Sequence, residues 1–123
     1  MQEIKPERVE KPWGYELIWA RTGRYVGKIL HIDKGHALSL QYHVRKDETV
    51  HVLRGRMLFQ TGSEGQPLQE SVLGPGDSFH ITPLLRHRMI AQTDCDVLEV
   101  STPELDDVVR LQDDFGREGT SAP

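Results

Sequence analysis

The chain has 123 residues, and 15 Lys and Arg against 19 Asp and Glu give a net charge of −4 with neutral histidines. This length predicts one domain, and the mildly acidic balance provides no basic patch for nucleic acid or an anionic membrane. No apolar run exceeds the four residues 17–20, which excludes a transmembrane helix or signal peptide, and the single Cys95 favours a reducing, cytoplasmic location.

Short apolar stretches separated by turns that contain glycine or proline run along most of the chain. Most stretches are five to eight residues long, which is typical of strands rather than helices. Strands at this spacing are typical of an antiparallel sandwich or barrel. We therefore predict an all-β fold with strands at 15–19, 25–32, 38–44, 49–53, 57–61, 68–73, 78–82, 87–92 and 96–101.

The two ends of the chain differ from this pattern. Residues 1–10 are polar and are expected to form a flexible arm that becomes ordered only against another surface. Residues 11–117 are predicted to form the barrel domain, in which 102–104 could begin a helical turn and 106–117 could be a strand or a short helix. Residues 118–123 have nothing to bury, so we expect a disordered tail.

Four polar residues in the middle of the chain have the spacing of a metal site. Gln41 and His43 stand two apart on a predicted strand, so their side chains project from one face. Glu48 can return from the next strand to the same interior, and His87 lies at the start of a later strand. Two imidazoles, a carboxylate and an amide oxygen suit Zn²⁺, Mn²⁺, Fe²⁺, Co²⁺ or Ni²⁺ without selecting among them. Singly, such residues more often belong to a solvated surface.

The glycines around these residues add a resemblance to a known family. The first motif of the cupin family, with Gln in place of its first His, resembles Gly35-x5-Gln41-x-His43-x4-Glu48-x6-Gly55. The second cupin motif resembles Gly76-x6-Pro83-x3-His87. Among cupins, the chain is similar to the type II mannose-6-phosphate isomerase domains over residues 11–117. That similarity lies in 11–15, 38–43, Glu48, 75–77, His87, 107–110 and 114–117.

The resemblance implies a fold, a cofactor and an assembly. The fold is a double-stranded β-helix, or jelly-roll, barrel that usually forms a dimer. One divalent transition metal is implied inside the barrel near one mouth, with Gln41, His43, Glu48 and His87 as its ligands. The chain departs from the isomerase pattern at 44–47, Val50 and 103–106. These departures spare the four ligands, so they affect the expected substrate more than the metal.

Other charged residues are candidates for catalysis or substrate binding. Glu99 and Lys28 lie on alternating strands, where a register slip of one residue would reverse the side that faces the interior. If they face inward, Glu99 could move a proton and Lys28 could hold an anionic or hydroxyl group; the alternative for each is an outward surface charge. A substrate phosphate could be bound by Arg86, Arg88, Lys46 or Arg110.

The leading functional hypothesis is a metal-dependent aldose–ketose isomerase that acts on a sugar phosphate such as mannose 6-phosphate. Two alternatives stay open. One is a different metal-dependent enzyme on the same fold, such as an iron or nickel dioxygenase or a lyase; the other is a non-catalytic cupin that binds a sugar or metabolite. All three predict a small-molecule ligand, a homodimer, and no nucleic-acid or membrane partner.

Overall fold

The computed structural model describes residues 1–120, and all regular structure within them is β-strand, as predicted. One sheet contains β1 (Glu7–Lys11), β2 (Gly14–Arg21), β3 (Val26–Ile32), β5 (Glu48–Arg54), β8 (Ser78–Ile81) and β10 (Cys95–Ser101). The other contains β4 (Leu40–Tyr42), β6 (Met57–Gly62), β7 (Gln69–Leu73), β9 (Arg86–Ala91), β11 (Val109–Gln112) and β12 (Gly119–Thr120).

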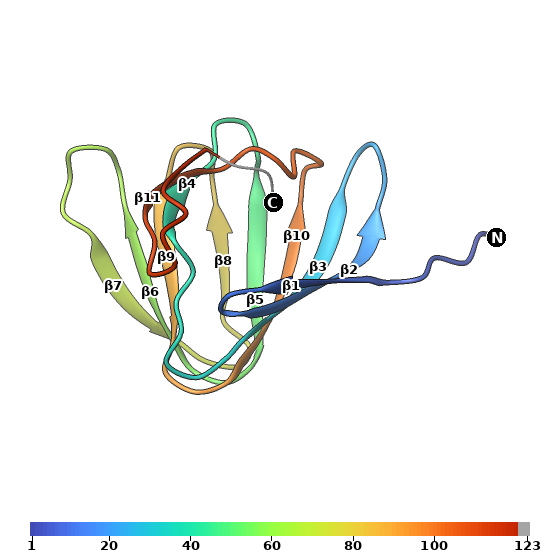
Figure 1. The fold of residues 1–123 in the computed structure, drawn as a ribbon, viewed down its shortest axis with the longest axis horizontal. Helices are drawn as coiled ribbons and strands as arrows, with labels where there is room; N and C mark the ends of the chain where they lie inside the picture. Colours follow the sequence, from blue (N-terminus) through green and yellow to red (C-terminus); the bar gives the residue numbers. More distant parts are fainter. Residues whose placement is uncertain (121–123) are drawn as a thin grey trace.

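The strand order brings segments that are distant in the sequence side by side. It is β1-β2-β3-β10-β5-β8 in one sheet and β12-β11-β4-β9-β6-β7 in the other, and the neighbouring strands are antiparallel. The two sheets face each other across the interior (Figure 1). Two facing antiparallel sheets with long crossover connections form a jelly-roll barrel, which confirms the predicted fold class.

The barrel interior is lined by alternate side chains of each strand. In β5, Glu48, Val50 and Val52 are buried, whereas Thr49 and His51 between them are only partly buried. Both sheets contribute to one apolar core, and each large side chain in it stabilises the fold by roughly 1.5–3 kcal/mol. The core contains Trp13, Leu30, Ile32, Leu38, Val50, Val52, Met57, Phe59, Leu73, Ile81, Met89, Ala91, Cys95 and Val97.

Part of the segment expected to be a flexible arm is ordered by the chain itself. Residues 7–10 belong to β1, which pairs with β2 from Glu7 opposite Ile18 to Lys11 opposite Gly14. Backbone hydrogen bonds to β2 therefore take the place of a contact with another surface. Residues 1–6 have no regular structure.

The C-terminal segment is a strand rather than a helix. β11 pairs with β4 on one side and with β12 on the other, so residues 119–120 of the predicted tail are paired, and 121–123 lie outside the described residues. No helix begins at 102–104: the chain makes only a tight turn at 105–106, in which the Asp107 amide donates to the Glu104 carbonyl at 3.4 Å, while the Thr102 amide donates to the Asp47 carbonyl at 3.0 Å. In the described part of the chain, no helix has the length and hydropathy needed to cross a membrane.

Three loops meet at one end of the barrel, the upper end in Figure 1. They are 43–47 between β4 and β5, 82–85 between β8 and β9, and 102–108 between β10 and β11. Backbone hydrogen bonds join them: the Leu84 amide donates to the His43 carbonyl at 2.7 Å, in addition to the bond between Thr102 and Asp47. These loops position the polar side chains described next.

Candidate metal centre

Four strands carry a buried polar side chain toward the end of the barrel where the three loops meet. In β3, β5, β9 and β10, the inward side chains near this end are polar rather than apolar. They are Lys28, Glu48, His87 and Glu99, and none of them is more than 4% exposed. Glu99 pairs with Lys28 on one side and with Val50 on the other. Both Glu99 and Lys28 therefore face the interior, which excludes the alternative of outward surface charges.

His43, Glu48 and His87 bring one potential ligand atom each to within 4.8 Å of the others. His43 Nε2 lies 2.8 Å from Glu48 Oε2, yet these two atoms and His87 Nε2 are buried without a hydrogen-bond partner among the described residues. The short contact lacks hydrogen-bond geometry. Three buried polar atoms without partners are costly, and one cation between them would satisfy all three. The cluster therefore fits a metal ion.

The two imidazoles are held in the tautomer that a metal needs. His43 Nδ1 lies 2.6 Å from the Asp107 carbonyl oxygen, and His87 Nδ1 lies 2.9 Å from that of Leu85. A carbonyl can only accept, so each Nδ1 donates and each neutral ring presents the Nε2 lone pair to the cluster.

The electrostatics of the cluster also favour the protonation states in which His87 and Glu48 can bind a metal. Burial lowers the pKa of His87 to about 4, against the opposing effect of Glu48. Burial alone would raise the pKa of Glu48, but the Lys46 ammonium and the two imidazoles hold that pKa well below its ordinary value. At neutral pH the site therefore contains a neutral His87 and an ionised Glu48, the states in which these side chains bind metals.

Gln41, the fourth ligand expected from the sequence, lies beside this cluster. It is the register partner of His87 across β4 and β9, so the two side chains share a face. Its Oε1 accepts a hydrogen bond from Ser39 Oγ at 2.8 Å. Gln41 and His43 line the same cavity, and a metal-bonding role for Gln41 stays a prediction.

Two buried ion pairs extend inward from the cluster. Lys46 Nζ lies 3.1 Å from Glu99 Oε2 and 3.5 Å from Glu48 Oε2, and Lys28 Nζ lies 3.3 Å from Glu16 Oε1. Burial would lower the pKa of Lys46, but Glu99 and Glu48 raise it. Burial also raises the pKa of Glu99, although Lys46 opposes this. The cluster thus has a carboxyl group able to hold a proton close to it.

An inner cavity of about 60 Å³ adjoins the cluster at His43, and most of the charged residues that line it are cations. Lys28 and Lys46 are joined there by Arg110, a predicted phosphate-binding residue. Lys11 and Arg117 also line the cavity; both lie in stretches that carry the isomerase resemblance, which assigns them no role in a site. Burial lowers the pKa of Lys11, and burial together with Arg117 lowers the pKa of Arg110. No local spacing links Lys11 to Arg117, because opposite ends of the chain supply them.

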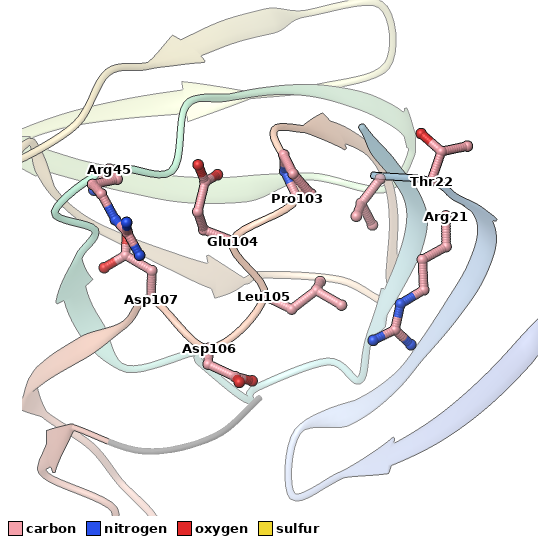
Figure 2. A pocket seen from close by; sticks show the side chains of 9 residues that line it. Arg21, Thr22, Arg45, Pro103, Glu104, Leu105, Asp106 and Asp107 are labelled. Atoms are coloured by element: carbon pink, nitrogen blue, oxygen red, sulfur yellow. The ribbon is translucent and has the colours of Figure 1, made fainter. Parts of the chain in front are cut away.

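A larger outer pocket of about 520 Å³ lies on the other side of segment 103–107. Figure 2 shows Arg45 and Asp107 on one side of this pocket and Arg21 and Thr22 on the other, with the segment running between them. Leu105 lines both the outer pocket and the inner cavity. Leu105 therefore lies between the inner cavity and the outer pocket.

The remaining phosphate-binding candidates lie away from the inner cavity. Arg86 lines a different surface pocket with Tyr42 and Leu84, and as the neighbour of His87 on β9 it projects to the opposite face. Arg88 forms an ion pair with Asp114 at 2.8 Å. Of the four phosphate-binding candidates, Lys46 and Arg110 line the inner cavity, and Arg86 and Arg88 do not.

The fold and the cluster together define a small jelly-roll barrel with an internal site that could bind a metal. The sequence model of the family described as Cupin domain matches residues 28–101, more than half of the chain. The chain belongs to the cupin family. No curated protein sequence matches it.

Solved structures share this fold. KdgF from Halomonas sp. is 24% identical with a TM-score of 0.65, over 79% of this chain and 87% of that one. The capsular polysaccharide assembling protein CapF from Staphylococcus aureus is 14% identical with a TM-score of 0.74, over 89% of this chain and 35% of that one. Oxalate decarboxylase from Bacillus subtilis is 15% identical with a TM-score of 0.73, over 85% of this chain and 30% of that one.

These identities establish the shared fold alone. The chain spans about a third of the length of CapF and of oxalate decarboxylase. Mn(II) centres are described for B. subtilis oxalate decarboxylase.

Proposed function

We propose that this chain is a metal-dependent enzyme that moves a proton between adjacent carbons of a sugar phosphate or a related small acid, as in aldose–ketose isomerisation. The observation that carries the proposal is the convergence of three unpartnered ligand atoms, from His43, Glu48 and His87, beside the buried Lys46–Glu99 pair. The resemblance to mannose-6-phosphate isomerase domains supports the choice of substrate class.

The roles of the residues follow from their environments. A divalent ion held by His43, Glu48 and His87, with Gln41 as a fourth ligand, would polarise a carbonyl and its neighbouring hydroxyl group. Glu99 is the candidate base, because burial raises the pKa of its carboxyl above the ordinary value. Lys46, 3.1 Å away, stabilises the carboxylate form of Glu99. Lys28, which is paired with Glu16 and lines the cavity, would contact a substrate hydroxyl group.

One observation favours a second candidate, another metal-dependent reaction such as that of a dioxygenase or a lyase. The inner cavity, at about 60 Å³, has the volume of about two water molecules. It would accept a small acid more easily than a hexose phosphate unless segment 103–107 moves. Dependence of turnover on O₂ would select an oxygenase. Ligand binding without turnover would support the non-catalytic alternative.

Metal content and proton exchange test the proposal together. The purified chain is compared with the His43→Ala/His87→Ala double variant and with His51→Ala, a matched control because His51 faces away from the interior of the same barrel. Near-stoichiometric metal is expected in the wild type and the control, and none in the double variant. Isomerisation of mannose 6-phosphate and related sugar phosphates in D₂O, followed by NMR, should be lost with the metal.

Two results would contradict the proposal. The first is a wild-type protein that contains no metal even after incubation with divalent ions. The second is isomerisation that continues unchanged in the double variant.

We further propose that the protein is a cytoplasmic homodimer. β1 is the outer strand of its sheet, so one edge of its backbone is not paired within the described residues. Such edges are commonly covered by another chain. Ile4, just before β1, is 53% exposed and offers an apolar anchor for that contact.

A further inference from the structure

We propose that Arg110 and Lys11 form a subsite for a small oxyanion, the carboxylate or phosphoryl group of a ligand, inside the barrel next to the metal cluster. The inference deepens the proposed function and rests on it only for the identity of that ligand as a substrate. The residues, their burial and their charges carry the subsite itself.

Arg110 is a largely buried cation with no ion-pair partner among residues 1–120. Its side chain enters the inner cavity from β11, only 8% of the residue is exposed, and its Nε has no hydrogen-bond partner among the described residues. A guanidinium keeps its charge at any physiological pH. Burying such a charge without a partner is strongly unfavourable, so the arrangement is explained if an anion completes it.

The charges around the inner cavity do not balance. Its lining contains five cations, Lys11, Lys28, Lys46, Arg110 and Arg117, and one carboxylate, Glu16. Three of the cations have carboxylate partners: Lys28 pairs with Glu16, Lys46 with Glu99, and Arg117 with Asp113. Within residues 1–120, Lys11 and Arg110 have none. Two positive charges thus converge on a cavity that has room for a carboxylate or phosphoryl group.

The subsite and the metal cluster lie in one row across the sheet. Gln41 on β4 is the register partner of Arg110 on β11 and of His87 on β9. Neighbouring strands are about 4.8 Å apart, so Arg110 and His87 are separated by roughly 10 Å of sheet. A ligand bound through its oxyanion at Arg110 would therefore place the next few atoms of its chain at the metal. This suits a short acid or a sugar phosphate.

Binding of inorganic phosphate and of acetate to the full chain tests the proposal, at constant ionic strength with chloride as the reference anion. Titration calorimetry and the melting temperature are measured for the wild type, Arg110→Gln and Lys11→Gln. The matched controls are Arg24→Gln and Lys34→Gln, which remove the same charges from exposed positions. Each protein is measured with and without prior removal of metal by a chelator.

We expect one or both anions to bind and to raise the melting temperature of the wild type and the controls, with or without metal. Affinity should fall about tenfold or more in Arg110→Gln and Lys11→Gln, because charge-assisted hydrogen bonds are lost. Without anions, Arg110→Gln should melt above the wild type, because a buried unpaired charge is removed. The preferred anion identifies the ligand group as carboxylate or phosphoryl.

Three outcomes would overturn the subsite: neither anion binds, all variants bind equally, or binding requires the metal and is lost in His87→Ala but not in Arg110→Gln. If the anion binds through Arg110 while no divalent ion is ever bound, the subsite stands and the proposed metal-dependent function fails.

Discussion

Asp107 contacts both the candidate metal centre and the loop that carries it. Its backbone carbonyl accepts the hydrogen bond of His43 Nδ1. Its carboxylate accepts hydrogen bonds from the amides of Val44, Arg45 and Lys46 at 3.0, 2.6 and 2.8 Å. Burial opposes ionisation, but these bonds keep the pKa of Asp107 below its usual value. Asp107 is therefore a positioning residue for His43 and Lys46.

Replacing Asp107 by Ala should weaken metal binding without removing a ligand. We expect affinity for Zn²⁺ to fall by about tenfold, the lower end of the effect of losing a group that orients a metal ligand, because the backbone carbonyl that orients His43 remains and only the loop that carries it is loosened. Three amides lose their acceptor, so stability should fall by about 1–3 kcal/mol. Chelator competition and urea unfolding measure the two effects. The control is Asp106→Ala, an exposed neighbouring carboxylate; equal affinities in the two variants would contradict this role.

At the scale of elements, the turn between β8 and β9 combines backbone strain with a contact to the site. Leu84 has a φ of 72°, the only positive φ of a non-glycine residue among those described. Its side chain is 60% exposed, and its amide donates to the His43 carbonyl. The turn thus joins the segments that carry His43 and His87. It holds Leu84 in the left-handed backbone region, which is energetically unfavourable for leucine.

Leu84→Asn should therefore stabilise the protein, by about 1 kcal/mol, because asparagine adopts a positive φ at lower cost. Little apolar burial is lost at so exposed a position. Val44→Asn is the matched control, since Val44 is 53% exposed in the neighbouring loop without a positive φ. Urea unfolding measures both. A Leu84→Asn variant no more stable than the control would show that the turn is not strained.

The strands that could be predicted from the sequence are those whose own residues form an apolar run or alternate between apolar and polar. The interior strands around the core have such a pattern, and they lie within a residue or two of their predicted bounds. β1 and β12 lack it, because pairing with β2 and β11 rather than burial defines them. The inward orientation of Glu99 could not be fixed in advance, because both faces of β10 carry apolar residues: Cys95 and Val97 share the face of Glu99, and Leu98 and Val100 lie on the other.

At the scale of the whole molecule, acid should destabilise the metal-free barrel. The pKa of His87 is about 4 in the fold and about 6.5 in an unfolded chain. Between these values the unfolded chain binds one proton more, so stability is full above pH 6.5 and falls as the pH decreases toward 4. From pH 6.5 to 4.5 the loss should be about 2 kcal/mol.

Urea unfolding in the presence of a chelator, at pH values from 4.5 to 7.5, measures this loss. The pKa of Glu48 is lowered, so Glu48 contributes only below its ordinary value. The raised pKa of Glu99 acts in the opposite direction, because stability from its protonated form is lost as the pH rises above its ordinary value. The loss assigned to His87 is therefore read from the difference between the wild type and His87→Gln. His87→Gln should flatten the pH dependence, whereas His51→Gln, which changes an outward histidine, should not. Parallel pH profiles for the two variants would contradict the assignment.

The candidate site could be predicted only where its residues are close in sequence or share a motif. Spacing identifies His43, Glu48 and His87, which the fold brings together. Lys11 and Arg117 lie in stretches that carry the isomerase resemblance, but no spacing assigns them to the site, because they meet only after β1 and the C-terminal segment have folded onto the barrel. Long-range assembly of this kind leaves no local spacing that identifies its members as site residues.

The hydrogen bond from His43 to Asp107 connects the candidate metal centre to segment 103–107. The segment that accepts it is also the one whose Leu105 lies between the inner cavity and the outer pocket. A displacement of this segment that includes Asp107 would remove the partner that orients His43. Metal binding and such a displacement would then be thermodynamically linked: a bound ion would oppose the displacement, and the displacement would weaken binding of the ion by the same free energy.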